Sequence, residues 1–274
     1  MYAAQIDQLD QNVGKIVSKL RQLGILDNTL IFFMSDNGGN YEEMGRFTPG
    51  QQRPPYMPYK TKEGQPVVPG NDPSIIPGSA TTYASYGIPW GNVSNTPFRM
   101  YKHYAHEGGI STPFIAHWPR GLKNTGISHT IGHEIDVMPT CLEVAGIPYP
   151  KVSKAGTEPP PLEGKSLVPI FEGRMLPERS LFWEHEGNSA AREGKWKLVS
   201  KFPDSWELYD MEHDRTEMHD LADQYPDRVK KMAADYKEWA TRVGVQPWPM
   251  PETPAGPIRD GAMPAPAYLL HDRI

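Results

Sequence analysis

Residues 31–41 read IFFMSDNGGNY, a short apolar run that breaks into an acid, an amide and two glycines. A continuous apolar run of this kind, bounded by turn residues, indicates a buried strand. Asp36 and Asn37 follow the run directly, and open α/β sheets bind their ligands beyond the carboxyl ends of strands. The stretch therefore predicts a strand and also the place where a site would lie.

The segment before this strand predicts a helix. Its apolar residues recur at helical spacing: Ile6, Leu9, Val13, Ile16, Val17, Leu20 and Leu23. Gly24 is a favourable left-handed end for this helix, and Asp27-Asn28 form a turn into the strand. A helix followed by an apolar strand indicates an α/β domain whose parallel strands are covered on both faces. Because the apolar pattern begins almost at the first residue, we expect the chain to start inside a longer domain.

The middle of the chain alternates between loop and regular structure. Residues 40 to about 100 are crowded with Pro, Gly and Tyr and show no lasting periodicity, which is typical of functional loops. Residues 110–118 predict a second strand, and residues 136–145 predict a helix that ends at Gly146.

From residue 180 the pattern changes to the short stretches LFWEHE, AAREGKWKLVS and WELYDM, which predict a small antiparallel sheet. A helix with one apolar face follows Pro226. Its apolar positions are Val229, Met232, Ala233, Tyr236, Trp239 and Val243. We therefore divide the chain into a main domain at 1–178, a sheet-and-helix subdomain at 179–246 and a Pro-rich tail at 247–274.

The composition excludes several classes of protein. With 28 basic and 33 acidic residues, the net charge of −5 gives no electrostatic reason to expect nucleic acid or an anionic membrane as partner. No stretch approaches the roughly 18 apolar residues of a membrane span. The single cysteine, Cys141, cannot form an intramolecular disulfide.

Taken alone, Asp-Asn-Gly-Gly at 36–39 is most often a turn, because Asn and Gly tolerate a positive φ. Its position after a buried strand favours a site instead. A carboxylate and an amide oxygen are hard ligands, which suit Ca²⁺ or Mg²⁺ better than Zn²⁺.

A second motif, TPFRMYKHYAHEGG, covers residues 96–109. Its cations Arg99, Lys102, His103 and His106 stand just before two glycines that allow backbone to approach a ligand closely. The alternative is a solvated, charged loop. His106-Glu107-Gly108-Gly109 is not the zinc motif H-E-x-x-H, because no second histidine follows. We interpret His129 and His133 as ordinary residues.

Several stretches together resemble, in order, the C-terminal part of type I sulfatases of the arylsulfatase kind. They are the first helix, LDNTLIFFMSDNGG, WGNVSNTPFRMYKHYAHEGGISTPFIAHWP, IDVMPTCLEVAG, and the region from LFWEHEGN to WELYDMEHDRTEMHDLA. The resemblance covers nearly the whole chain. It implies an alkaline phosphatase-like α/β fold, here partial, with a mixed sheet flanked by helices and a small C-terminal subdomain of antiparallel strands plus a helix.

The resemblance also implies roles for single residues. Asp36 and Asn37 match ligands of an active-site Ca²⁺. Related phosphohydrolases usually carry His at the position of Asn37, which suits two zinc ions, whereas an amide suits one hard cation and a sulfate ester. Lys102 matches the catalytic lysine that contacts the sulfate oxygens. His106 and Trp90 match positions near the pocket, and His106 is assigned to substrate binding.

The nucleophile of the family is a formylglycine made from the Cys or Ser of C-x-P-S-R or S-x-P-S-R. Neither motif occurs, and Cys141 is followed by Leu-Glu-Val. We therefore expect a C-terminal portion of a sulfatase, with formylglycine and two aspartate ligands in a missing N-terminal part. The parent would hydrolyse the sulfate ester of a small molecule or a glycan, and this portion alone would be inactive.

Two alternatives stay open. The first is a phosphodiesterase or phosphonate hydrolase of the same superfamily, which Asn37 disfavours. The second is a non-catalytic protein that kept the scaffold and binds an anion or a partner. The sequence gives neither the oligomeric state nor the compartment, and a periplasmic or secreted location would need a leader in the missing part.

Overall fold

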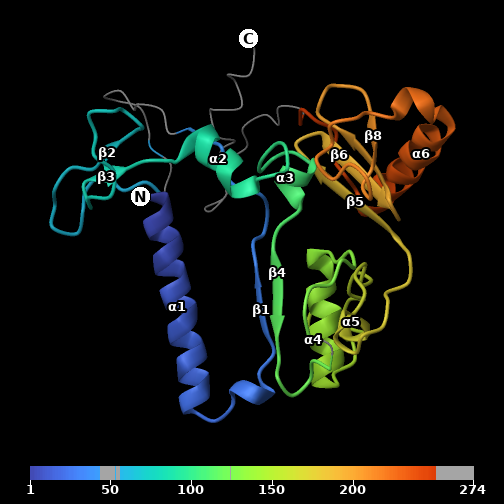
Figure 1. The fold of residues 1–274 in the computed structure, drawn as a ribbon, viewed down its shortest axis with the longest axis horizontal. Coiled ribbons are helices and arrows are strands. Elements are labelled where there is room, and N and C mark those ends of the chain that lie inside the picture. The colour runs from blue at the N-terminus through green and yellow to red at the C-terminus, as the bar shows by residue number, and fades with distance from the viewer. Residues whose placement is uncertain (44–52, 54–55, 124, 251–274) are drawn as a thin grey trace.

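The computed structural model describes residues 1–43, 53, 56–123 and 125–250 (Figure 1). The chain begins with the predicted helix, α1 at Tyr2–Gln22, and Gly24 follows it with φ +69°. No residue of α1 is buried, and Ile16 on its apolar stripe is 61% exposed. The apolar face of α1 is therefore left uncovered by the described residues.

A short 3-10 helix, η1 at Leu26–Asn28, leads into β1 at Ile31–Met34. β1 pairs with β4, Phe114–His117, and the register sets Ile31 opposite His117 and Met34 opposite Phe114. This pairing is antiparallel, so the parallel arrangement expected for the strand is wrong for the pair described. The reason is the path of the chain, because it leaves β1 and re-enters β4 at the same end of the ribbon (Figure 1).

The long connection between β1 and β4 holds little regular structure. Its elements are β2 at Val68–Pro69, β3 at Thr82–Tyr83, α2 at Gly87–Asn95 and α3 at Glu107–Ile110. β2 and β3 pair in parallel over two residues. In Figure 1, α2 and α3 lie beyond the ends of β1 and β4, where Asp36 and Asn37 also fall.

The segment after β4 contains η2 at Glu134–Asp136, α4 at Val137–Ala145 and α5 at Val168–Phe171. α4 ends at Gly146 with φ +65°, which confirms the predicted helix and its end. Buried Asp136 forms an ion pair with Arg179, which joins this segment to the start of the C-terminal sheet. In the view of Figure 1 the β1–β4 ribbon runs between α1 and α4, so helices flank the strands.

The C-terminal region forms the predicted sheet and helix. Four antiparallel strands lie in chain order: β5 at Ser180–His185, β6 at Asn188–Glu193, β7 at Trp196–Ser200 and β8 at Glu207–Asp210. After η3 at Ala222–Gln224, the helix α6 at Pro226–Val243 packs Met232 against Leu198 and Leu208. The domain boundaries at 178 and 246 stay predictions, and residues 251–274 of the predicted tail lie outside the described residues.

A second buried cluster joins the two parts of the chain. Ala105, from the segment before α3, packs with Ala190, Val199 and Tyr209 of the C-terminal sheet. The sheet therefore supports the motif at 96–109 directly. None of the helices within the described residues is long and apolar enough to cross a membrane.

Candidate functional site

The loop after β1 carries the two residues predicted to bind a cation. Asp36 is exposed, whereas Asn37 is half-buried. The side-chain oxygen Oδ1 of Asn37 is buried and has no hydrogen-bond partner among the residues that the structure describes. A buried acceptor without a partner costs free energy, so such an atom points to a ligand that completes it.

The two glycines of the loop bring it against the motif at 96–109. The Gly38 N–H donates to the Gly109 carbonyl at 2.8 Å, and the Gly39 N–H donates to Oδ1 of Asn95 at 2.7 Å. A Cβ at position 38 would lie 1.8 Å from the Gly108 carbonyl oxygen. Close approach of two backbones, more than turn formation, is what requires glycine at position 38.

We expect Gly38→Ala to lower the free energy of unfolding by about 1–3 kcal/mol, because the methyl group overpacks a backbone contact. Gly14→Ala is the matched control, because no atom lies within 4 Å of a Cβ built at Gly14 in α1. That change should stabilise the protein by roughly 0.5–1 kcal/mol, the usual gain of alanine in a helix. Urea denaturation of both variants checks the prediction, and equal changes in the free energy of unfolding would contradict it.

Lys102 lies next to the same loop. Its N–H donates to the Gly39 carbonyl at 3.1 Å, although 63 positions separate the residues in sequence. The side chain is 37% exposed, and Nζ lies 3.8 Å from Oε2 of Glu42. The fold thus brings the backbones of Lys102 and the Asp36-Asn37 loop together, and contact of the ammonium with a sulfate stays a prediction.

His106 has a different environment from Lys102. It is fully buried, and its Nε2 lies 3.1 Å from Oε2 of Glu207 in β8. Its Nδ1 has no hydrogen-bond partner among the described residues. Contact of His106 with substrate stays a prediction. Trp90, on α2, is 44% exposed and packs against Tyr2 with ring centroids 5.3 Å apart.

Glu207 receives several favourable contacts. The hydrogen bond with His106, together with those from Tyr209 and the charge of Arg99, lowers the pKa of Glu207 from 4.5 to about 2 against the effect of burial. A carboxyl group whose pKa is lower in the folded than in the unfolded state stabilises the fold at pH values above its unfolded pKa. This contribution is complete above about pH 4.5 and is lost as the pH falls toward about 2.

We therefore expect Glu207→Gln to lower the melting temperature at pH 7 and to have a diminishing effect as the pH is lowered below 4.5. Thermal unfolding measured across this range checks the prediction. Glu193→Gln is a suitable control, because the 39% exposed Glu193 side chain pairs with Lys231 at the surface. If Glu207→Gln lowered the melting temperature by the same amount at every pH, the result would contradict the lowered pKa of Glu207.

A buried ion cluster, which was not predicted from the sequence, fixes α3 to the C-terminal sheet. Nζ of Lys197 lies 2.8 Å from Oε1 of Glu107 and 2.8 Å from Oε1 of Glu217. All three residues are buried. Burial raises the pKa of Glu107, but the Lys197 ammonium outweighs this, and the pKa lies below its usual value. The sequence signal was a lysine inside the apolar strand WKLVS.

Arg99 makes a further connection to the sheet. Its Nη1 donates to the Tyr209 hydroxyl at 3.1 Å and to the Glu217 carbonyl at 2.7 Å. Burial, followed by the hydrogen bond to Glu207, raises the pKa of Tyr209 well above its usual value. Arg99 and His106 thus both contact the sheet, whereas the backbone N–H of Lys102 contacts the Gly39 carbonyl.

The donors of this loop fit a hard cation. Asp36 offers a carboxylate, and Asn37 offers a buried amide oxygen without a partner among the described residues. Ca²⁺ prefers such oxygen ligands and takes six to eight of them, so others would have to complete the shell. Binding of a divalent cation by this loop, and of an anion beside it through Lys102, stays a prediction.

Two protein families match this chain. The family described as Sulfatase matches residues 1–147, more than half of the chain. The family described as N-sulphoglucosamine sulphohydrolase, C-terminal, matches residues 98–242. The two matches overlap over residues 98–147, which include most of the motif at 96–109, and together they cover the main part and the C-terminal sheet.

Individual relatives agree with these matches. An uncharacterised sulfatase of Schizosaccharomyces pombe is 29% identical over 253 residues, which cover 89% of this chain and 44% of the relative. An arylsulfatase of Klebsiella aerogenes is 32% identical over 181 residues, which cover 66% of this chain and 36% of the relative. The chain therefore spans less than half the length of these relatives.

The fold also matches solved structures. The crystal structure of Ps i-CgsB in complex with k-i-k-neocarrahexaose superposes with a TM-score of 0.60 at 22% sequence identity, covering 87% of this chain and 42% of the other. This likeness confirms the predicted partial α/β fold.

Proposed function

This chain belongs to the sulfatase family, and on that premise we propose that Asp36, Asn37 and Lys102 are part of a site that hydrolyses a sulfate ester. The observation that carries the proposal is the buried Oδ1 of Asn37, which lacks a partner among the described residues. The contact between Lys102 N–H and the Gly39 carbonyl supports a common site for the cation ligands and the lysine.

In this proposal Asp36 and Asn37 hold one Ca²⁺. When bound, the cation acts as a Lewis acid that polarises an oxygen of the sulfate group. Lys102 binds the sulfate oxygens through its ammonium group and orients the ester. Its positive charge stabilises the negative charge that grows on those oxygens and on the leaving oxygen as the S–O bond breaks.

The nucleophile has to come from elsewhere in the complete enzyme. Neither C-x-P-S-R nor S-x-P-S-R occurs in these 274 residues. Since the matched relatives are more than twice as long as the part they share with this chain, we propose that the formylglycine and further carboxylate ligands belong to the part not represented. The 274 residues then supply the cation and anion contacts without the covalent step.

The substrate is proposed to be a sulfate ester of a small molecule or a glycan. One neighbour in fold is a complex with k-i-k-neocarrahexaose, so a sulfated glycan is the first substrate to test. A phosphodiesterase of the same superfamily is less favoured, because Asn37 offers an amide where two zinc ions would call for imidazole.

The test is Asn37→Ala in the complete enzyme. We expect affinity for Ca²⁺ and turnover of an aryl sulfate to fall together, because the variant removes an oxygen ligand. Asn12→Ala in exposed α1 serves as the control and should change neither. Calcium titration by calorimetry and sulfate release measure the two effects. Unchanged Ca²⁺ affinity would exclude Asn37 as a ligand, and a preference for phosphate diesters would favour the phosphodiesterase.

A further inference from the structure

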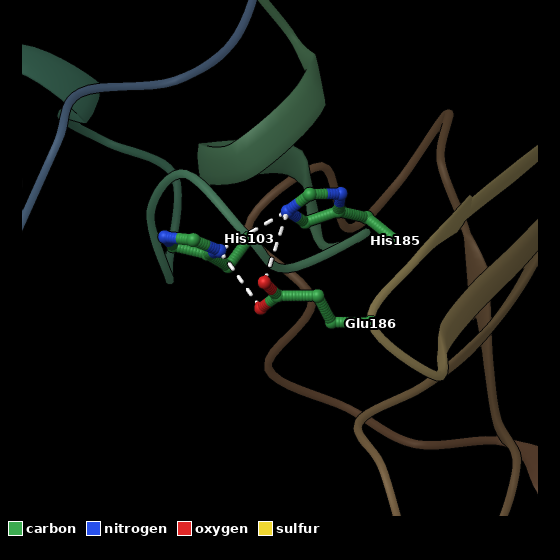
Figure 2. Close-up of side chains that lie close together, drawn as sticks. All are labelled: His103, His185 and Glu186. Carbon is green, nitrogen blue, oxygen red and sulfur yellow. Dashed lines mark hydrogen bonds and ion pairs between the residues drawn. The ribbon is translucent and has the colours of Figure 1, made fainter. Parts of the chain in front are cut away.

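Three side chains converge at a second place, between the motif at 96–109 and the first hairpin of the C-terminal sheet (Figure 2). His103 comes from the segment before α3, His185 ends β5, and Glu186 lies in the turn to β6. Nδ1 of His103 lies 3.0 Å from Nε2 of His185 and 2.9 Å from Oε2 of Glu186. Nε2 of His185 lies 3.9 Å from Oε1 of Glu186.

These separations fit one small cation. Zinc bonds of about 2.0–2.1 Å in a tetrahedral site place neighbouring ligand atoms roughly 3.3 Å apart. The three donor atoms all lie within 4.8 Å of one another, so small side-chain rotations bring them to that spacing. Two imidazoles and one carboxylate occupy three positions of a tetrahedral site and leave the fourth for water or another oxygen.

The other nitrogen of His103 also has a suitable neighbour. Nε2 of His103 lies 3.5 Å from Oε1 of Glu42. Histidines that bind metals usually direct the second ring nitrogen to a carboxylate, which fixes the ring and strengthens it as a ligand. Glu42 lies where such an outer partner is needed, in the loop that also carries Asp36 and Asn37.

The backbone supports a built site. His103 has φ +83° and Glu186 has φ +53°, a region that residues other than glycine rarely adopt. Glu186-Gly187 form the two-residue turn between β5 and β6, where Asn or Asp would be the usual first residue. Residues kept in such conformations gather at functional sites, where the surrounding structure compensates for the strain.

We propose that His103, His185 and Glu186 bind a divalent cation of the zinc type, at a site separate from that of Asp36 and Asn37. Imidazole ligands select zinc-like cations, whereas the carboxylate and amide of the other loop select calcium. His185 is 54% exposed, so the site is open to exchange with solution. The bound cation joins the segment of Lys102 to the β5–β6 hairpin and stiffens it.

The test is titration of the 274-residue chain with Zn²⁺ against a coloured chelator, with stoichiometry and affinity as readouts. We expect one site in the wild-type chain. His185→Ala and His103→Gln should each lower the affinity for Zn²⁺ by more than about 100-fold, because each removes a direct ligand. Glu42→Gln removes only an outer partner and should lower the affinity about 10- to 100-fold. Excess Ca²⁺ should not displace Zn²⁺.

Two controls make the result specific. His213→Ala removes the exposed histidine of the other acidic and histidine group, Asp210, Glu212 and His213, and should leave the affinity unchanged. Bound Co²⁺ should lack the charge-transfer band of a thiolate, which excludes the exposed Cys141 as ligand. Circular dichroism confirms folding of each variant. Equal affinity in wild type and His185→Ala, or displacement by Ca²⁺, would overturn the proposal.

Discussion

Lys102→Ala is expected to lower the turnover of the complete sulfatase about 100- to 1,000-fold, the loss that follows removal of one preorganised charge-stabilising group. The ammonium group is proposed to bind the sulfate oxygens, and the backbone N–H of Lys102 contacts the carbonyl of Gly39, two residues after Asn37. Because a cation is no ligand for Ca²⁺, calcium affinity should change little. Sulfate release under saturating substrate, measured over a calcium titration, separates the two effects.

Lys123→Ala is the matched control, because this lysine is 74% exposed and pairs with Glu172 away from the Gly38-Gly39 loop. It should leave turnover unchanged. Lys102→Arg keeps the charge but changes its geometry, so we expect partial recovery. If Lys102→Ala instead weakened calcium binding at normal turnover, the role of Lys102 would be to position the loop through its ion pair with Glu42.

The second large effect concerns stability. Lys197→Met is expected to lower the free energy of unfolding by about 3–5 kcal/mol, because it removes the cation that lies between two buried carboxylates. Lys197 lies 2.8 Å from both Glu107 and Glu217, and methionine keeps its length while removing its charge. Urea denaturation of the chain measures the loss. A fall in pH should narrow this loss of unfolding free energy, since protonation of Glu107 removes one of the two buried negative charges.

Lys195→Met tests whether burial is the cause. Lys195 lies in the β6–β7 turn, two residues before Lys197, and its solvent-exposed side chain forms an ion pair with Asp210 at 2.6 Å. We expect a much smaller change for this variant. Equal losses at positions 195 and 197 would show that the buried cluster contributes no more than a surface pair.

Much of the local structure is encoded locally. Helical spacing of apolar residues predicted α1, α4 and α6, and short stretches separated by turn residues predicted the C-terminal strands, because each pattern needs only the geometry of one element. The same holds for the position of Asp36 and Asn37 directly after β1. The family could be recognised from the combination of motifs, although no single motif was specific enough.

The partners of the charged residues could not be predicted in this way. Arg99, His103 and His106 all stood as candidates beside Lys102 in one charged segment. The fold pairs them with residues 82 to 110 positions away, in the C-terminal sheet. Composition and spacing carry no information about such distant pairs, and only the family resemblance singled out Lys102.

The sequence by itself determined the helices α1, α4 and α6, most of the strands, the hard oxygen donors at Asp36 and Asn37, and the family. Only the tertiary structure decided the antiparallel pairing of β1 with β4, the glycine contact between the two loops, and the buried cluster around Lys197. The physical reason is the different sequence range over which these interactions act. Backbone propensity and periodicity act over a few residues, whereas strand direction, burial of charge and the convergence of ligands depend on where distant segments meet.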